Sequence, residues 1–114
     1  MKVYIASPYG RRKGCSDEEC ETNVNRAIGV GRKLITLGHI PFVPHLFHYL
    51  HEGWDGSPNE DEWLKMCLAF VPFCDCVLRL KGESVGADNE VALAKVFNKK
   101  VYYNIEELIS HTSD

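Results

Sequence analysis

The sequence lacks the long apolar run that a membrane-spanning helix needs, because no stretch of its 114 residues approaches about 18 consecutive apolar positions. We expect no signal peptide either, because the opening segment, residues 1–5, is typical of a strand and no cleavage-type apolar region follows it. Internal repeats, low-complexity segments and linkers are absent as well. These absences predict one domain over residues 1–114, cytoplasmic and without a membrane partner.

An excess of positive charge is also missing. The formal net charge is −3, and the longest basic run is only Arg11-Arg12-Lys13. Such a chain offers no basic face, so we expect no nucleic-acid polymer among its partners.

Cysteine is present in an odd number, five, and Cys74 and Cys76 alternate along one expected strand. Without a secretion signal, this pattern favours reduced thiols over a disulfide framework. Zinc binding is the alternative, and its donors would come from Cys15, Cys20, His45, His48 and His51. Their spacing matches no common zinc pattern, and His48 and His51 are expected at the surface. We therefore predict neither a metal nor another cofactor.

Short apolar runs alternate with segments of helical periodicity. Strands are expected over residues 2–7, 40–43, 75–80 and 100–103. Helices are expected over residues 21–37, 61–70 and 90–98 and from about residue 105, with a polar loop over 11–20 and a helical turn followed by a loop over 45–59. This order predicts an α/β fold: a small doubly wound parallel sheet of four to five strands flanked by helices, Rossmann-like or flavodoxin-like.

In such folds ligands bind beyond the carboxyl ends of the strands. Those ends are expected at residues 6–10, 44–45 and 80–90. His45, Trp54 and Asp55 lie in the loop-rich segment near them and are candidates for ligand contact. Trp54 has an alternative role as a packing anchor for its loop.

Glu90 is the carboxylate that most needs an explanation. At 100° per residue it shares the apolar stripe of its helix with Ala87, Val91 and Ala94, and burying a carboxylate there is costly. We expect Glu90 in the first helical turn, where the helix dipole keeps it ionised and fit to act as a nucleophile, a base or an ion-pair partner.

Ser84 and Gly86 precede Glu90 and could bind an anion such as phosphate. Alternatively, the segment from Ser84 to Glu90 has only a structural role. In that case Ser84 is an N-cap, Gly86 is a turn residue, and Glu90 pairs with an arginine such as Arg79.

The chain resembles the nucleoside 2-deoxyribosyltransferase-like superfamily, in particular its small bacterial and phage branch. The resemblance spans most of the length and rests on the opening VYIASPYG, on GHIPFVPH, on the pair Cys74-Asp75, and on the S-x-G-x-x-x-E run of Ser84, Gly86 and Glu90. Among these motifs, the last is the most specific.

The resemblance implies cleavage or transfer at the N-glycosidic bond of a (deoxy)nucleoside or its 5′-monophosphate. Glu90 matches the nucleophile that attacks the anomeric carbon, and Tyr4 matches the tyrosine that hydrogen-bonds this carboxylate. A serine at position 84, where transferases of free nucleosides carry an aspartate, is similar to members that act on monophosphates. The substrate-binding residues predicted from the motifs and the strand ends are Ser7, Tyr9, Gly10, His45, Ser84 and Gly86.

One departure concerns the departing base. Better-known members place an aspartate in the helix before the third strand, whereas this chain has Cys67 at about that position. A thiol is a poor general acid at neutral pH, so His45 or Asp88 is considered for the role. Asp75 is expected to be structural.

The principal alternative is a non-catalytic nucleotide-binding module with the same fold, which the exchange at Cys67 favours. The resemblance also implies a homodimer or higher homo-oligomer in which a neighbour's loop closes the site.

Overall fold

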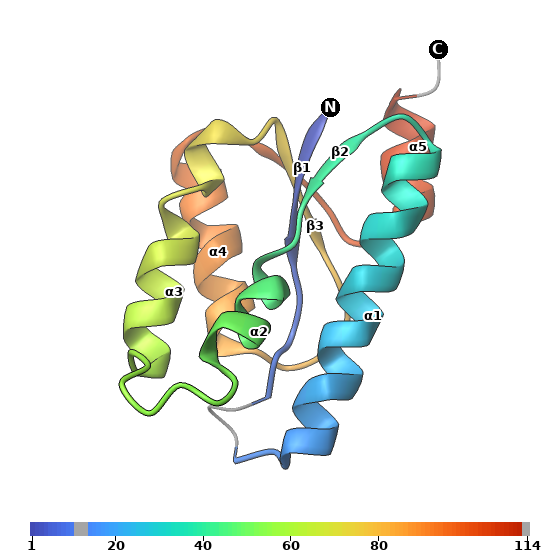
Figure 1. The fold of residues 1–114 in the computed structure, drawn as a ribbon. Helices are drawn as coiled ribbons and strands as arrows, with labels where there is room; N and C mark the ends of the chain where they lie inside the picture. Colours follow the sequence, from blue (N-terminus) through green and yellow to red (C-terminus); the bar gives the residue numbers. More distant parts are fainter. Residues whose placement is uncertain (11–13, 113–114) are drawn as a thin grey trace.

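The computed structural model describes residues 1–10 and 14–112, so the basic run at 11–13 lies outside the described residues. Its centre is a four-stranded parallel sheet in the order β2-β1-β3-β4 (Figure 1). The strands are β1 (Lys2–Ala6), β2 (Ile40–Phe42), β3 (Cys76–Arg79) and β4 (Lys100–Tyr102). Tyr4 of β1 is in register with Phe42 of β2 and with Val77 of β3. The predicted α/β fold with a parallel sheet is confirmed.

Helices cover both faces of this sheet (Figure 1). One face is covered by α1 (Asp17–Thr36) and α5 (Ile105–Thr112), and the other by α3 (Glu60–Leu68) and α4 (Val85–Val96). A short α2 (Phe47–His51) follows a 3-10 turn (Pro44–Leu46), and a second 3-10 turn (Val71–Phe73) precedes β3. Because the chain leaves β1 in one direction through α1 and returns past it through α3, the sheet is doubly wound.

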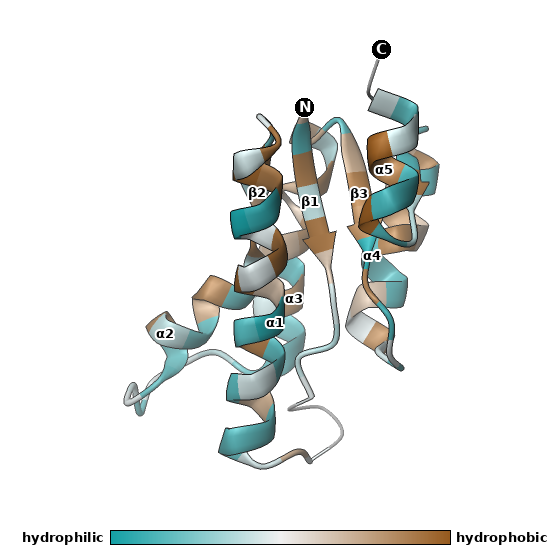
Figure 2. Ribbon diagram, turned by 90° about the vertical axis from the view of Figure 1, so that its right-hand side faces the viewer, coloured by the Kyte–Doolittle hydropathy of each residue, from teal (hydrophilic) through white to brown (hydrophobic). Residues whose placement is uncertain are grey.

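The core consists of two apolar layers, one on each side of the sheet. Val3 and Ile5 pack in the layer beneath α1 and α5, whereas Tyr4 and Ala6 pack in the layer beneath α3 and α4. A strand that is buried on both faces has no polar side, which explains the continuous apolar run of β1. Figure 2 shows the hydrophobic colours along β1 and β3 and hydrophilic ones on the outer side of α1. No helix within the described ranges has the length and apolar character needed to cross a membrane.

Two helices begin at least one turn earlier than predicted, in each case because a serine caps them. The α1 helix starts at Asp17 instead of residue 21, so the expected loop over 11–20 is wrong for its last part. Ser16 accepts from the Glu19 amide at 3.2 Å, and the Glu19 carboxylate accepts from the Ser16 amide at 3.0 Å. This capping box satisfies two backbone donors that apolar periodicity does not reveal. Likewise, α4 starts at Val85 instead of Glu90.

Removing the α1 cap is expected to destabilise the protein measurably. Ser16→Ala deletes the oxygen that accepts from the Glu19 amide, so the free energy of unfolding should fall by about 1 kcal/mol. Urea denaturation measures this change. Ser110→Ala, at an exposed position inside α5, is the matched control and should stay within about 0.5 kcal/mol of the native chain. Equal effects of the two variants would contradict the cap's contribution.

Candidate active site

A pocket of about 320 Å³ opens at the carboxyl ends of the strands, a volume in the range of small-molecule sites. Its walls come from the loop after β1, the segment around α2, α3, and the first two turns of α4. All six residues predicted to bind substrate line it, and so does Glu90: the set is Ser7, Tyr9, Gly10, His45, Ser84, Gly86 and Glu90. The fold thus brings together side chains that are far apart in sequence.

Glu90 is buried in the pocket wall with only 5% of its surface exposed. The Tyr4 hydroxyl, which comes from β1 beneath α4, donates a hydrogen bond to Glu90 Oε2. Tyr4 itself is fully buried, and burial together with the neighbouring Glu90 raises the pKa of its phenol far above the usual range. Tyr4 therefore stays neutral and acts as a fixed donor to one carboxylate oxygen.

The protonation of Glu90 differs from the prediction. Burial raises its pKa to about 8, although the Tyr4 hydrogen bond and the Arg79 charge act in the opposite direction. We expected the first helical turn to keep this group ionised, but α4 starts at Val85 and places Glu90 in its second turn. There the backbone N–H groups are engaged within the helix and no longer favour a negative charge. Glu90 is thus largely protonated at neutral pH in the free protein.

Arg79 does not serve as the structural partner of Glu90. Its guanidinium forms an ion pair with Asp88 at 3.1 Å and donates to the Gly82 carbonyl at 2.8 Å. Within the described part of the chain, no ion pair joins Arg79 to Glu90. The alternative that explained Glu90 by such a pair is therefore wrong.

Ser84 is the N-cap of α4, as the structural alternative for this stretch proposed. Its hydroxyl accepts from the Ala87 amide at 3.0 Å. Gly86 lies in the first helical turn and does not form a separate turn. Capping leaves the Ser84 hydroxyl proton free to donate, and both residues line the pocket, so the cap and a ligand contact are compatible.

Three polar atoms of the pocket lining have no hydrogen-bond partner among the described residues, and two of them, Ser7 Oγ and His45 Nδ1, lie at the carboxyl ends of the strands. Both residues are buried, at 4% and 7% exposure. The other nitrogen of His45, Nε2, lies 3.1 Å from the Pro8 carbonyl, to which it donates. Burial lowers the pKa of His45, so its ring is neutral and Nδ1 is an acceptor. Leaving a buried polar group unpaired costs about 1–3 kcal/mol, which a ligand with polar groups would offset.

None of the three groups considered for protonating the departing base is well suited to it. Burial and the nearby Glu90 raise the pKa of Cys67 to about 12, so its thiol holds its proton tightly. His45 is neutral, and Asp88 is exposed and absent from the pocket lining. Two other carboxylates, Glu60 and Glu83, do line the pocket and were missed from the sequence. Among the described residues, the lining contains no lysine or arginine.

The segment from His45 to Asn59 departs most from expectation. His48 is buried at 6% exposure, not at the surface, and lines the pocket. Trp54 and Asp55 are exposed and do not line it; Trp54 instead contacts Trp63 edge-on, with ring centroids 6.5 Å apart. The aromatic wall of the pocket is a stack of Phe47 on Trp63, with centroids 5.6 Å apart. Only the tertiary fold reveals that stack.

Asp75 has the structural role that we expected. Its Oδ2 accepts from the Lys2 amide at 2.7 Å, and its own amide donates to the Lys2 carbonyl at 2.7 Å. These bonds join the starts of β1 and β3, far from the pocket. The cysteine and histidine set considered for zinc does not form a common cluster; the one group of possible ligands in the described chain is Glu21, His48 and Glu52.

Two solved structures share this architecture. The 2-deoxyribosyltransferase of the psychrotolerant bacterium Bacillus psychrosaccharolyticus has a TM-score of 0.62 at 19% identity, over 89% of this chain and 69% of that one. The 2-deoxyribosyltransferase of Leishmania mexicana has a TM-score of 0.57 at 16% identity, over 88% of this chain and 61% of that one. The chain therefore has the nucleoside 2-deoxyribosyltransferase-like fold that its motifs predicted, and identity this low establishes the fold alone.

A comparison with curated proteins returned no match. A family model, by contrast, covers residues 1–104 and bears the description "Domain of unknown function (DUF7768)". Because that span includes nearly the whole chain, the protein belongs to the DUF7768 family.

Proposed function

We propose that this protein cleaves or transfers at the N-glycosidic bond of a (deoxy)nucleoside or a (deoxy)nucleoside 5′-monophosphate, with Glu90 as the nucleophile. Glu90 first loses its proton to solvent, and its Oε1 then attacks the anomeric carbon as the bond to the base breaks. The base departs with the bonding electrons and takes up a proton from solvent. Water or a second base then displaces the carboxylate from the glycosyl ester and loses a proton as the new bond forms. The likeness in fold to two 2-deoxyribosyltransferases supports this reaction class.

The observation that carries the proposal is the buried Glu90 in the pocket wall, with Tyr4 bound to one of its oxygens. A carboxylate that is expensive to bury and has no cation as an ion-pair partner in the described chain is not explained by stability. Tyr4 occupies Oε2 and leaves Oε1 for the sugar. A charged oxygen fixed in this way would also stabilise the positive charge that develops on the sugar in the transition state.

The rest of the pocket suits a nucleoside. The stacked pair Phe47 and Trp63 presents flat apolar surface of the kind on which a base packs. Ser7 Oγ and His45 Nδ1, which lack partners within the described ranges, are available to hydroxyl groups of a sugar.

Ser84 provides a test of which end of the substrate lies at the start of α4. We propose that the 5′ group binds there, so Ser84→Asp should place a carboxylate beside it and repel a phosphate. The variant should lose at least about tenfold in kcat/KM for a 5′-monophosphate relative to the free nucleoside. Because aspartate is also a good N-cap, the fold should persist. Parallel assays of matched nucleoside and monophosphate pairs measure the ratio, and an unchanged ratio would contradict this placement.

Chromatographic detection of free base from a mixed pool of nucleosides and nucleotides, with and without an acceptor base, tests the proposed reaction. Release without an acceptor indicates hydrolysis, and a new nucleoside that appears only with the acceptor indicates transfer. Saturable binding by calorimetry with no base released over hours would instead support the non-catalytic binding module, an outcome that the tightly held proton of Cys67 would explain.

A further inference from the structure

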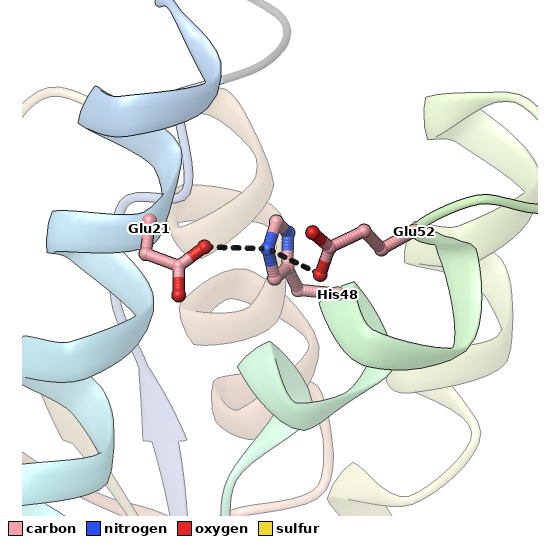
Figure 3. A group of neighbouring side chains, drawn as sticks. All are labelled: Glu21, His48 and Glu52. Carbon is pink, nitrogen blue, oxygen red and sulfur yellow. Dashed lines mark ion pairs between the residues drawn. The ribbon is translucent and has the colours of Figure 1, made fainter.

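A cluster of three possible metal ligands lies at the rim of the pocket, between α1 and α2 (Figure 3). Glu21 projects from α1, His48 lies on α2, and Glu52 follows α2 directly. One ligand atom from each residue lies within 4.8 Å of the other two. The proposed reaction at Glu90 does not use Glu21 or Glu52. The cluster therefore needs an explanation of its own.

His48 is the group that points to a ligand. Its side chain is only 4% exposed, yet among the described residues Nε2 has no hydrogen-bond partner and only the longer contacts to Glu21 and Glu52. In Figure 3 the ring stands between the two carboxylates. The other ring nitrogen, Nδ1, lies 2.5 Å from the Tyr9 hydroxyl. When Nδ1 carries the proton and donates to Tyr9, Nε2 presents its lone pair to the carboxylates, which is how a histidine that binds a metal is usually held.

The distances within the cluster suit a metal ion. Nε2 lies 3.4 Å from Glu21 Oε2 and 3.7 Å from Glu52 Oε2. Ligands that lie about 2.0–2.2 Å from a tetrahedral ion are separated from one another by roughly 3.3–3.6 Å. A single ion could therefore contact all three atoms after modest side-chain shifts. The glutamate side chains are 46% and 61% exposed, so solvent can reach the ion and complete its coordination.

We propose that Glu21, His48 and Glu52 bind a divalent first-row transition-metal ion such as Zn²⁺, which fastens α2 to α1 at the pocket rim. One imidazole and two carboxylates form a mixed nitrogen and oxygen donor set, which suits such ions better than Mg²⁺ or Ca²⁺. Two carboxylates that face one buried ring repel each other, and a divalent cation cancels their charge. The sequence did not indicate this set because Glu21 and His48 lie on different helices.

Titration calorimetry with ZnCl₂ on the tag-free, chelator-treated chain tests the proposal. We expect one saturable ion per chain and a higher Tm with the metal, because an ion that binds only the folded state stabilises it. Glu21→Gln should weaken binding at least about tenfold, and the double variant Glu21→Gln/Glu52→Gln should abolish saturable binding. Co²⁺ in place of Zn²⁺ should give a visible spectrum without thiolate charge-transfer bands.

Matched variants separate this site from other sources of metal binding. Glu106→Gln changes an exposed glutamate of α5 and should bind Zn²⁺ as the native chain does. Cys15→Ser should do the same, which excludes the partly exposed thiol. The proposal fails if the native chain binds no Zn²⁺ saturably or if the double variant binds it equally well. It also fails if the metal leaves Tm unchanged, since the cluster is then only a set of ion pairs to His48.

Discussion

Glu90→Gln is expected to abolish base release from every nucleoside and nucleotide that the native protein accepts. Glutamine keeps the shape of the side chain and can still accept the Tyr4 hydrogen bond, but its amide oxygen cannot form the glycosyl ester. The loss in kcat should be on the order of 10⁴-fold or more, as when other enzymes lose their nucleophile. Chromatography of released base over hours, at matched enzyme concentration, measures it.

Asp88→Asn is the matched control for this experiment. Asp88 lies on the same helix, two positions earlier, but it is exposed, pairs with Arg79 and does not line the pocket. Its variant should retain activity within about twofold, since changes at exposed positions away from a site have small effects. Base release by Glu90→Gln at the native rate would refute the proposed mechanism, and circular dichroism of both variants shows whether the fold is retained.

Much of the architecture follows from local patterns in the sequence. The runs at β1 and β3 are apolar on both faces, which is typical of strands covered by helices on both sides, and their alternation with helical periodicity defines a parallel sheet. The carboxyl ends of parallel strands meet at one edge of the sheet. That rule alone predicts that Ser7, His45 and Ser84 lie together, and all three line the pocket.

The predictions that were wrong concern features that depend on helix caps and tertiary contacts. Ser84 caps α4 so that the helix begins at Val85 and not at Glu90. Glu90 therefore lies in the second turn, away from the helix N-terminus that was expected to keep it ionised. His48 is three positions from His45 in a polar segment and was expected at the surface, but the packing of α2 against α1 buries it. Apolar periodicity within one segment reveals neither the earlier start of α4 nor the burial of His48. The first depends on a single capping hydrogen bond, and the second on a partner elsewhere in the chain.

Because burial raises the pKa of Glu90 to about 8, the stability of the folded protein should depend on pH in a way that this residue controls. In the unfolded chain the group titrates at its ordinary value of 4.5, so between about pH 4.5 and pH 8 the folded state holds a proton that the unfolded state has lost. The contribution of Glu90 to stability is therefore fully present below about pH 4.5 and is lost as the pH rises through 8. The same proton must leave before Glu90 can attack a sugar, so kcat/KM should rise towards pH 8 while stability falls.

Glu90→Gln removes this dependence, since its amide does not ionise. The variant should gain stability relative to the native chain as the pH rises from 5 to 9, by up to about 4 kcal/mol. Urea denaturation at pH 5, 7 and 9 measures the gain. Glu106→Gln, which changes an exposed glutamate and no buried charge, is the control and should follow the native curve.

Parallel native and Glu90→Gln curves would mean that Glu90 has the same affinity for its proton in the folded and unfolded states, and burial would then not raise its pKa. A widening gap would show that the chain keeps a carboxylate that destabilises its fold at the pH where that carboxylate can react. Such a cost to stability is expected of a group that is retained for chemistry.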